Sequence, residues 1–87
     1  MPYITKNRRD YLDTRLADTS IGPPSQTAGE LNFEITTLLL GYLETKGLSY
    51  QTINDIVGAL EGAKLEFYAR VARPYEDTKI QQNGDVY

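Results

Sequence analysis

Two long helical segments separated by only three residues constrain the fold of this chain more than any other feature. Thr27-Ala28-Gly29-Glu30 matches a capping box, in which a threonine and a glutamate satisfy the first free backbone N–H groups of a helix. The pattern predicts a helix over about 28–46, which ends at Gly47. A further helix is predicted over about 50–73, where Pro74 ends it. So short a connection favours an antiparallel hairpin.

The remaining segments are expected to be short or extended. A shorter helix is predicted over about 7–18, with Asn7 as its cap. The linker 19–26 holds two adjacent prolines and cannot continue that helix. The tail 74–87 is predicted to be extended, and its Asn83-Gly84 pair is typical of a two-residue β-turn. The fold class is therefore all-α, in one small helical domain over residues 1–87.

A chain of this size needs additional stabilisation. It has 87 residues, with no cysteine and no histidine. Small domains usually rely on disulfides, a bound metal or self-association, and the first is excluded here. The absence of these two residue types also removes thiolate and imidazole ligands and the usual nucleophile–histidine pairs. We therefore expect a homo-oligomer, without a metal or another cofactor.

Charge and hydropathy exclude several classes of function. The net charge of −3 argues against a protein that binds duplex nucleic acid, since such proteins normally carry a basic surface. No apolar run approaches the length of a membrane span. The first residues lack the apolar stretch of a secretory signal. These features predict a cytoplasmic protein with no membrane partner.

The apolar positions of the helix over 28–46 cover more than one side. At about 100° per residue, Leu31, Ile35, Leu38 and Tyr42 form one face, while Phe33 and Leu40 carry apolar character almost to the opposite side. One side can pack on the helix over 50–73. The other needs the N-terminal helix or a second subunit.

Lys64 lies close to the centre of the apolar face of the helix over 50–73. Glu61 is three residues earlier, and Asn54 lies at the edge of the same face. One interpretation is a structural ion pair between Lys64 and Glu61 at a helix contact. The other is a cationic group at the floor of a ligand pocket between helices.

A group of arginines and tyrosines occupies the end of that helix, at Tyr68, Arg70, Arg73 and Tyr75. Guanidinium groups bind phosphate through paired N–H donors, and aromatic rings stack on planar ligands. The group therefore suits a planar, anionic molecule. Basic residues near a helix C-terminus also complement the helix dipole without any ligand.

No catalytic motif is present, which argues against an enzyme. The sequence holds no phosphate-binding glycine loop and no nucleophile elbow. An enzyme that cleaves a cyclic nucleotide, with Glu61 and Lys64 as acid and base, is a weaker alternative, because nothing marks an activated nucleophile. Arg8 and Arg9 lie in the first turn of the N-terminal helix, where the helix dipole disfavours positive charge. They are either solvated surface charges or contacts to an anion.

Several motifs resemble those of a family of short proteins encoded by phages and prophages. The residues that carry the resemblance are Met-Pro-Tyr-Ile with Arg8-Arg9, Gly29-Glu30-Leu31-Asn32, Gly47-Leu48-Ser49-Tyr50, Ala63-Lys64-Leu65-Glu66-Phe67-Tyr68, and Pro74-Tyr75-Glu76-Asp77 with Asn83-Gly84-Asp85-Val86-Tyr87. The linker 19–26 departs from this pattern. In size, expected oligomerisation and lack of a catalytic set the chain is also similar to phage sponge proteins of the Sequestin and Lockin type.

The resemblance implies a protein that sequesters a nucleotide-derived immune signal, of the ADP-ribose or cyclic-nucleotide class, in the cytoplasm of an infected bacterium. The expected ligand-binding residues are Lys64, Tyr68, Arg70, Arg73, Tyr75, Glu61, Asn54, Asn32, Arg8 and Arg9. The basic side chains would neutralise a pyrophosphate, the tyrosines would stack on a base, and the others would hydrogen-bond ribose or base edges. The alternative is a protein-binding inhibitor or adaptor that acts on a host or phage complex.

Overall fold

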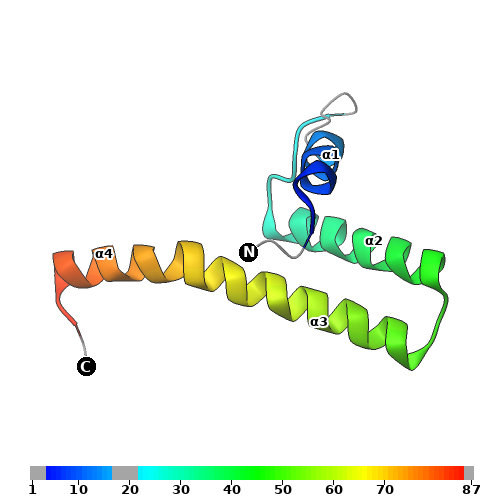
Figure 1. Ribbon diagram of the computed structural model, residues 1–87. Coiled ribbons are helices and arrows are strands. Elements are labelled where there is room, and N and C mark those ends of the chain that lie inside the picture. Colours follow the sequence, from blue (N-terminus) through cyan, green and yellow to red (C-terminus); the bar gives the residue numbers. More distant parts are fainter. Residues whose placement is uncertain (1–3, 17–21, 86–87) are drawn as a thin grey trace. The chain divides into compact units, whose positions relative to one another are not determined.

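The computed structural model describes residues 4–16 and 22–85. It contains α1 (Lys6–Leu16), α2 (Ala28–Lys46), α3 (Tyr50–Phe67), the π-helical segment η1 (Tyr68–Ala72) and α4 (Arg73–Asn83) (Figure 1). The described residues are therefore all-helical, with no strand among them, as the sequence predicts. By their contacts, the residues divide into two units, Met1–Ile35 and Thr36–Tyr87.

The cap of α1 is Thr5, and the prediction of Asn7 is wrong. The Arg8 N–H donates to the Thr5 hydroxyl at 3.3 Å, and the Arg9 N–H donates to the Thr5 carbonyl at 3.0 Å. A side chain caps a helix when it stands two or three residues before a free N–H group, and Thr5 meets this condition. The predicted end of this helix at residues 17–18, and residues 19–21 of the linker, lie outside the described residues.

The capping box at the start of α2 is confirmed. The Glu30 N–H donates to the Thr27 hydroxyl at 3.1 Å. The Glu30 carboxylate in turn accepts from the N–H of Gln26 at 3.3 Å, one residue before the usual position. α2 ends at Lys46, and Gly47 follows with φ of +84°, a conformation that glycine adopts without strain.

Ser49 caps α3. Its hydroxyl oxygen accepts from the Thr52 N–H at 3.1 Å, which satisfies one of the free donors at the helix start. The Ser49 hydroxyl also donates to the Thr52 hydroxyl at 3.1 Å. These bonds leave Thr52 with only 4% of its surface exposed. The connection between α2 and α3 is thus three residues long, as predicted.

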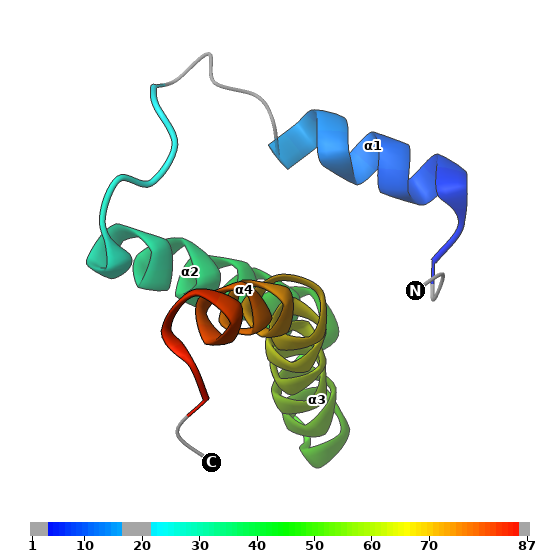
Figure 2. The ribbon, with the colours of Figure 1, turned by 90° about the vertical axis from the view of Figure 1, so that its left-hand side faces the viewer.

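The prediction that the helix ends at Pro74 and that an extended tail follows is wrong. The chain stays helical to Asn83, and η1 joins α3 to α4 in one helical run that changes direction at η1 (Figure 2). In a regular α-helix the Pro74 ring would clash with the carbonyl four residues earlier. In η1 the Arg73 N–H instead reaches back five residues to the Tyr68 carbonyl. This wider turn accommodates the proline just after it.

The Asn83-Gly84 pair ends a helix and does not form the predicted β-turn. Asn83 is the last residue of α4, and the Gly84 N–H donates to the Ile80 carbonyl at 2.8 Å. Gly84 has φ of +83°, so it serves as the glycine that commonly follows a helix. The same dipeptide suits both structures, because both need a positive φ. Residues 86–87 of the predicted tail lie outside the described residues.

The described residues contain no buried hydrophobic side chain. Leu12, Ile35, Leu39, Leu43 and Ile56 are half-buried. Large apolar side chains on every helix are exposed, such as Phe33 at 72% and Val57 at 60%. Local hydrogen bonds and caps define the helices. Full burial of apolar side chains, which normally stabilises helical proteins, is absent among the described residues.

Candidate functional site

Most of the expected ligand-binding residues lie on the helical run from α3 to α4. These are Asn54, Glu61 and Lys64 on α3, Tyr68 and Arg70 in η1, and Arg73 and Tyr75 on α4. Asn32 lies on α2, and Arg8 and Arg9 lie on α1, in the other unit. The Arg8 guanidinium stands 4.9 Å from the centre of the Tyr11 ring.

One face of α3 carries part of the predicted set. At about 100° per residue, Asn54, Glu61, Lys64 and Tyr68 fall within roughly 80° of one another. Lys64 Nζ lies 3.4 Å from Glu61 Oε1, so the ion pair that the spacing predicts is present. The Lys64 and Glu61 side chains are 62% and 55% exposed. At this exposure the pair is worth little to stability, and the Lys64 ammonium remains accessible to a ligand.

Arg70 lies on the other side of the run. Its Nε donates to the Glu66 carboxylate one turn earlier. This hydrogen bond and the positive charge of Arg70 hold the pKa of Glu66 below its ordinary value. The structure therefore does not bring Arg70 together with Lys64 and Tyr68 on one face. A ligand that engaged Arg70 would have to share it with Glu66.

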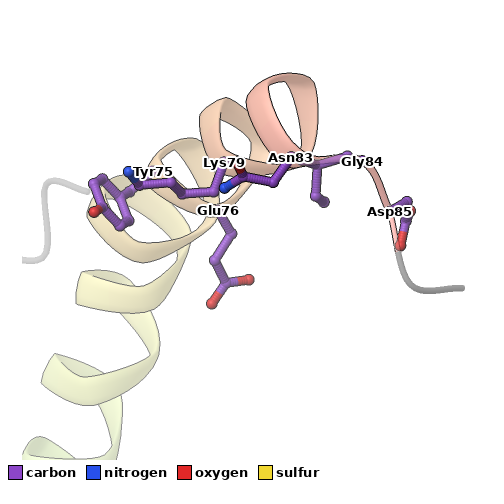
Figure 3. Close-up of a pocket in the computed structure, with 7 residues that line it drawn as sticks. Tyr75, Glu76, Lys79, Asn83, Gly84 and Asp85 are labelled. Atoms are coloured by element: carbon purple, nitrogen blue, oxygen red, sulfur yellow. The ribbon is translucent and has the colours of Figure 1, made fainter.

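Tyr75 is the one member of the predicted set that lines an open concavity on α4. This concavity has a volume of about 390 Å³, and its lining residues are Tyr75, Glu76, Lys79, Ile80, Asn83, Gly84 and Asp85. Lys79 extends along the helix toward Tyr75, and its ammonium lies 5.5 Å from the centre of the Tyr75 ring (Figure 3). Such a pairing combines an aromatic surface with a positive charge. Glu76 points away from this pair in the same view.

The sequence interpretation missed Lys79. Tyr75 and Lys79 are four residues apart, so they meet only if the segment is helical. The interpretation of Pro74 as a helix end removed that possibility. The four-residue spacing of Tyr75 and Lys79 is the sequence feature that indicates this contact, provided that the segment is helical.

A smaller concavity lies between the C-terminal half of α2 and α3. Its volume is about 200 Å³, and it is lined by Leu38, Leu39, Tyr42, Asp55, Ile56 and Ala59. The Tyr42 hydroxyl donates to Asp55 at 3.2 Å, and the Gln51 amide donates to the same carboxylate at 2.7 Å. The bond to the Asp55 carboxylate raises the pKa of Tyr42. No sequence pattern marks this contact, because it depends on how the three-residue connection turns.

The chemistry available at these places is binding chemistry. Ammonium and guanidinium groups with tyrosine rings can neutralise and stack on an anionic, planar molecule. Within the part of the chain that the structure describes, no three His, Cys, Asp or Glu residues are grouped so that they could hold a metal ion. In that same part, every helix is too short or too polar to cross a membrane.

Comparison with known proteins places the chain in a family. A family model described as "Domain of unknown function (DUF6899)" matches residues 1–86. The chain belongs to this family. The match includes both units and all the expected ligand-binding residues. No curated protein and no solved structure matches the chain.

Proposed function

We propose that the protein is a non-enzymatic, homo-oligomeric binding protein that sequesters a nucleotide-derived anion in the cytoplasm of a phage-infected bacterium. The observation that carries the proposal is the surface of the run from α3 to α4. Its lysines, arginines and tyrosines are exposed beside exposed apolar side chains, as Tyr68 beside Val71 and Tyr75 beside Ile80 illustrate. A second subunit that covers the apolar side chains would enclose the polar groups around a ligand.

The finer fold that we propose is an antiparallel hairpin of α2 and α3 within an oligomer. The hydrogen bond from Tyr42 to Asp55 supports it, because it joins the two helices across their short connection. The exposed apolar side chains support association, since a small chain without a buried apolar core is marginal alone. The resemblance to phage-encoded proteins favours an immune signal as the ligand.

In the proposed site, Lys64 and Lys79 supply positive charge to a pyrophosphate. Tyr68 and Tyr75 provide rings on which a base can stack. Arg73 lies between these two tyrosines in the chain and adds a guanidinium that can grip phosphate through two N–H groups. Turnover is not expected, because the site has no activated nucleophile.

Native mass spectrometry of protein purified from bacteria with an active nucleotide-signalling defence tests this function. We expect an oligomer that carries a nucleotide-sized adduct, which heat releases intact. Lys64→Ala and Arg73→Ala should lose the adduct, while Lys46→Ala at the end of α2 should retain it. An oligomer without any adduct, which also fails to bind added ADP-ribose or a cyclic dinucleotide, would contradict sequestration.

The alternative is a protein-binding inhibitor or adaptor, and the apolar surface of α2 favours it. Phe33 and Leu40 are 72% and 58% exposed and lie on a different side of α2 from Leu31 and Leu38. Exposed apolar patches commonly mark protein-binding surfaces. For this function, affinity purification from infected cells should recover one partner in fixed stoichiometry, and Phe33→Ser should release it. Recovery of the nucleotide adduct alone would contradict the alternative.

A further inference from the structure

α3 carries a regular apolar seam whose apolar side chains are about half exposed. The seam consists of Ile53, Val57, Leu60, Lys64 and Phe67, which follow one another at alternating steps of four and three residues. This is the spacing of the a and d positions of paired helices, in which Val57 and Lys64 occupy a and the other three occupy d. The four apolar members are between 42% and 60% exposed, and all five lie within the α-helical part of the run.

The seam is distinct from the side of α3 that faces α2. Asp55, Ile56 and Ala59 line the concavity shared with α2. At about 100° per residue, the centre of the seam lies roughly 110° around the helix from these residues. α3 therefore has two contact faces, and α2 occupies one of them.

The size of the seam suits a protein interface. With side-chain surfaces on the order of 150–200 Å² each, the four exposed apolar members present about 400 Å². A standard interface buries about 800 Å² on each partner. The seam supplies about half of that area, and the alkyl stem of Lys64 adds to it. Asn54, Glu61 and Tyr68 extend the seam along one side.

We infer that the seam binds the same seam of a second copy of this chain, with the two α3 helices antiparallel. Identical a and d patterns are complementary, because each apolar side chain fits between those of the facing helix. The chain has no cysteine and no buried apolar side chain among its described residues, and self-association would bury this surface.

Lys64 sets the orientation of the pair. In a parallel pair, a positions face each other, so Lys64 would meet the partner's Lys64 and two like charges would lie in the seam. In an antiparallel pair, Lys64 faces an apolar d position and lies beside the partner's Glu61. The ion pair that Lys64 makes with its own Glu61 at 3.4 Å then has an equivalent between subunits. A single charged residue in such a seam is a known determinant of register.

This inference specifies the self-association that the proposed function requires, and it does not depend on the ligand. The nucleotide adduct tests the ligand. The experiments below test the seam, so either idea can fail without the other.

Two matched leucine variants test the seam through the mass of the full-length protein in sedimentation equilibrium. Leu60 and Leu65 are both about half exposed, but Leu60 lies in the seam and Leu65 lies on the outer side of α3. Leu60→Glu should weaken self-association at least about tenfold, because it places charges in an apolar contact. Leu65→Glu should leave it unchanged. Equal effects of the two variants on self-association would overturn the inference. A wild-type protein that is monomeric in the same experiment would also overturn it.

Spin labels test the orientation, and they do not require any variant that disturbs the seam. Because the chain has no cysteine, a cysteine introduced at position 51 or 65 is the only thiol to label. Both positions lie on the outer side of α3, 14 residues apart. In an antiparallel pair centred between Glu61 and Lys64, the axial separation between equivalent labels is about 35 Å at position 51 and about 8 Å at position 65. Equal distances at the two positions would show a parallel pair and overturn the proposed orientation.

Discussion

Single hydrogen bonds determine much of the local structure of this chain. The capping box Thr27–Glu30 could be predicted, because capping depends on residue types at fixed short spacing. For α3 the sequence allowed either Ser49 or Thr52 as the cap, and the structure shows Ser49. The bond between Tyr42 and Asp55 could not be predicted, because its partners are 13 residues apart and meet only through the geometry of the connection.

The pKa of Tyr42 provides a test of the bond to Asp55. The Asp55 carboxylate accepts a hydrogen bond from the neutral phenol and repels the phenolate, so it raises the pKa of Tyr42 above the ordinary 10.0. The stabilisation is therefore present below pH 10 and is lost as the pH rises through the higher folded value. Ultraviolet titration should show a tyrosine step above pH 10.0. Asp55→Asn should abolish this late step, and Asp77→Asn should preserve it; a late step that survives Asp55→Asn would contradict the assignment.

The N-terminal cap of α2 provides a second test at this scale. Thr27→Ala removes the hydroxyl that accepts from the Glu30 N–H, and should lower the free energy of unfolding by about 1 kcal/mol. Thr37→Ala, an exposed position within α2, should have little effect or a slight stabilising one, because alanine is the better helix former. Chemical unfolding at one fixed protein concentration measures both. Equal losses at the two positions would show that the cap is not important.

At the scale of elements, the segment that follows α3 was the hardest to predict. Pro74 and Asn83-Gly84 were both interpreted by local rules, and the structure differs at both. A proline disfavours a preceding α-turn, but a π-turn satisfies the same steric requirement without ending the helix. The choice between these outcomes depends on whether the following segment is itself a good helix. The i, i+4 pair of Tyr75 and Lys79 is one feature that favours a helix there.

The π-turn is expected to depend on Pro74. Pro74→Ala removes the ring that clashes in a regular helix, so the Arg73 N–H should move from the Tyr68 carbonyl to the Ala69 carbonyl. The turn then contains one residue fewer, and α4 rotates by about 100° about the helix axis relative to α3. Nuclear magnetic resonance contacts across η1 should then show four-residue spacing in place of five. Pro23→Ala in the linker is the control, and a five-residue pattern that persists in Pro74→Ala would contradict the explanation.

The whole chain shows abundant apolar surface and no buried apolar side chain among the described residues. From the length, the lack of cysteine and histidine, and the apolar positions around α2, the sequence predicted that part of the apolar surface needs a further partner, but not that every apolar side chain would stay accessible. It could not indicate which surfaces would associate, because that depends on which face of α3 the α2 helix occupies. The expected ligand-binding residues show the same limit. Asn54, Glu61, Lys64 and Tyr68 lie on a helix as the sequence predicted, whereas Tyr75 was expected in an extended tail and lies on α4. The partner that would complete a site does not follow from the sequence.

We propose that this chain is stable only when its apolar helix faces bind another copy. The most direct test is sedimentation equilibrium of the full-length protein over a wide concentration range, with helix content followed by circular dichroism on the same samples. We expect an oligomer at high concentration, and a loss of helix content and of thermal stability on dilution, because association and folding are coupled. A monomer that keeps its full helix content at every concentration would contradict it.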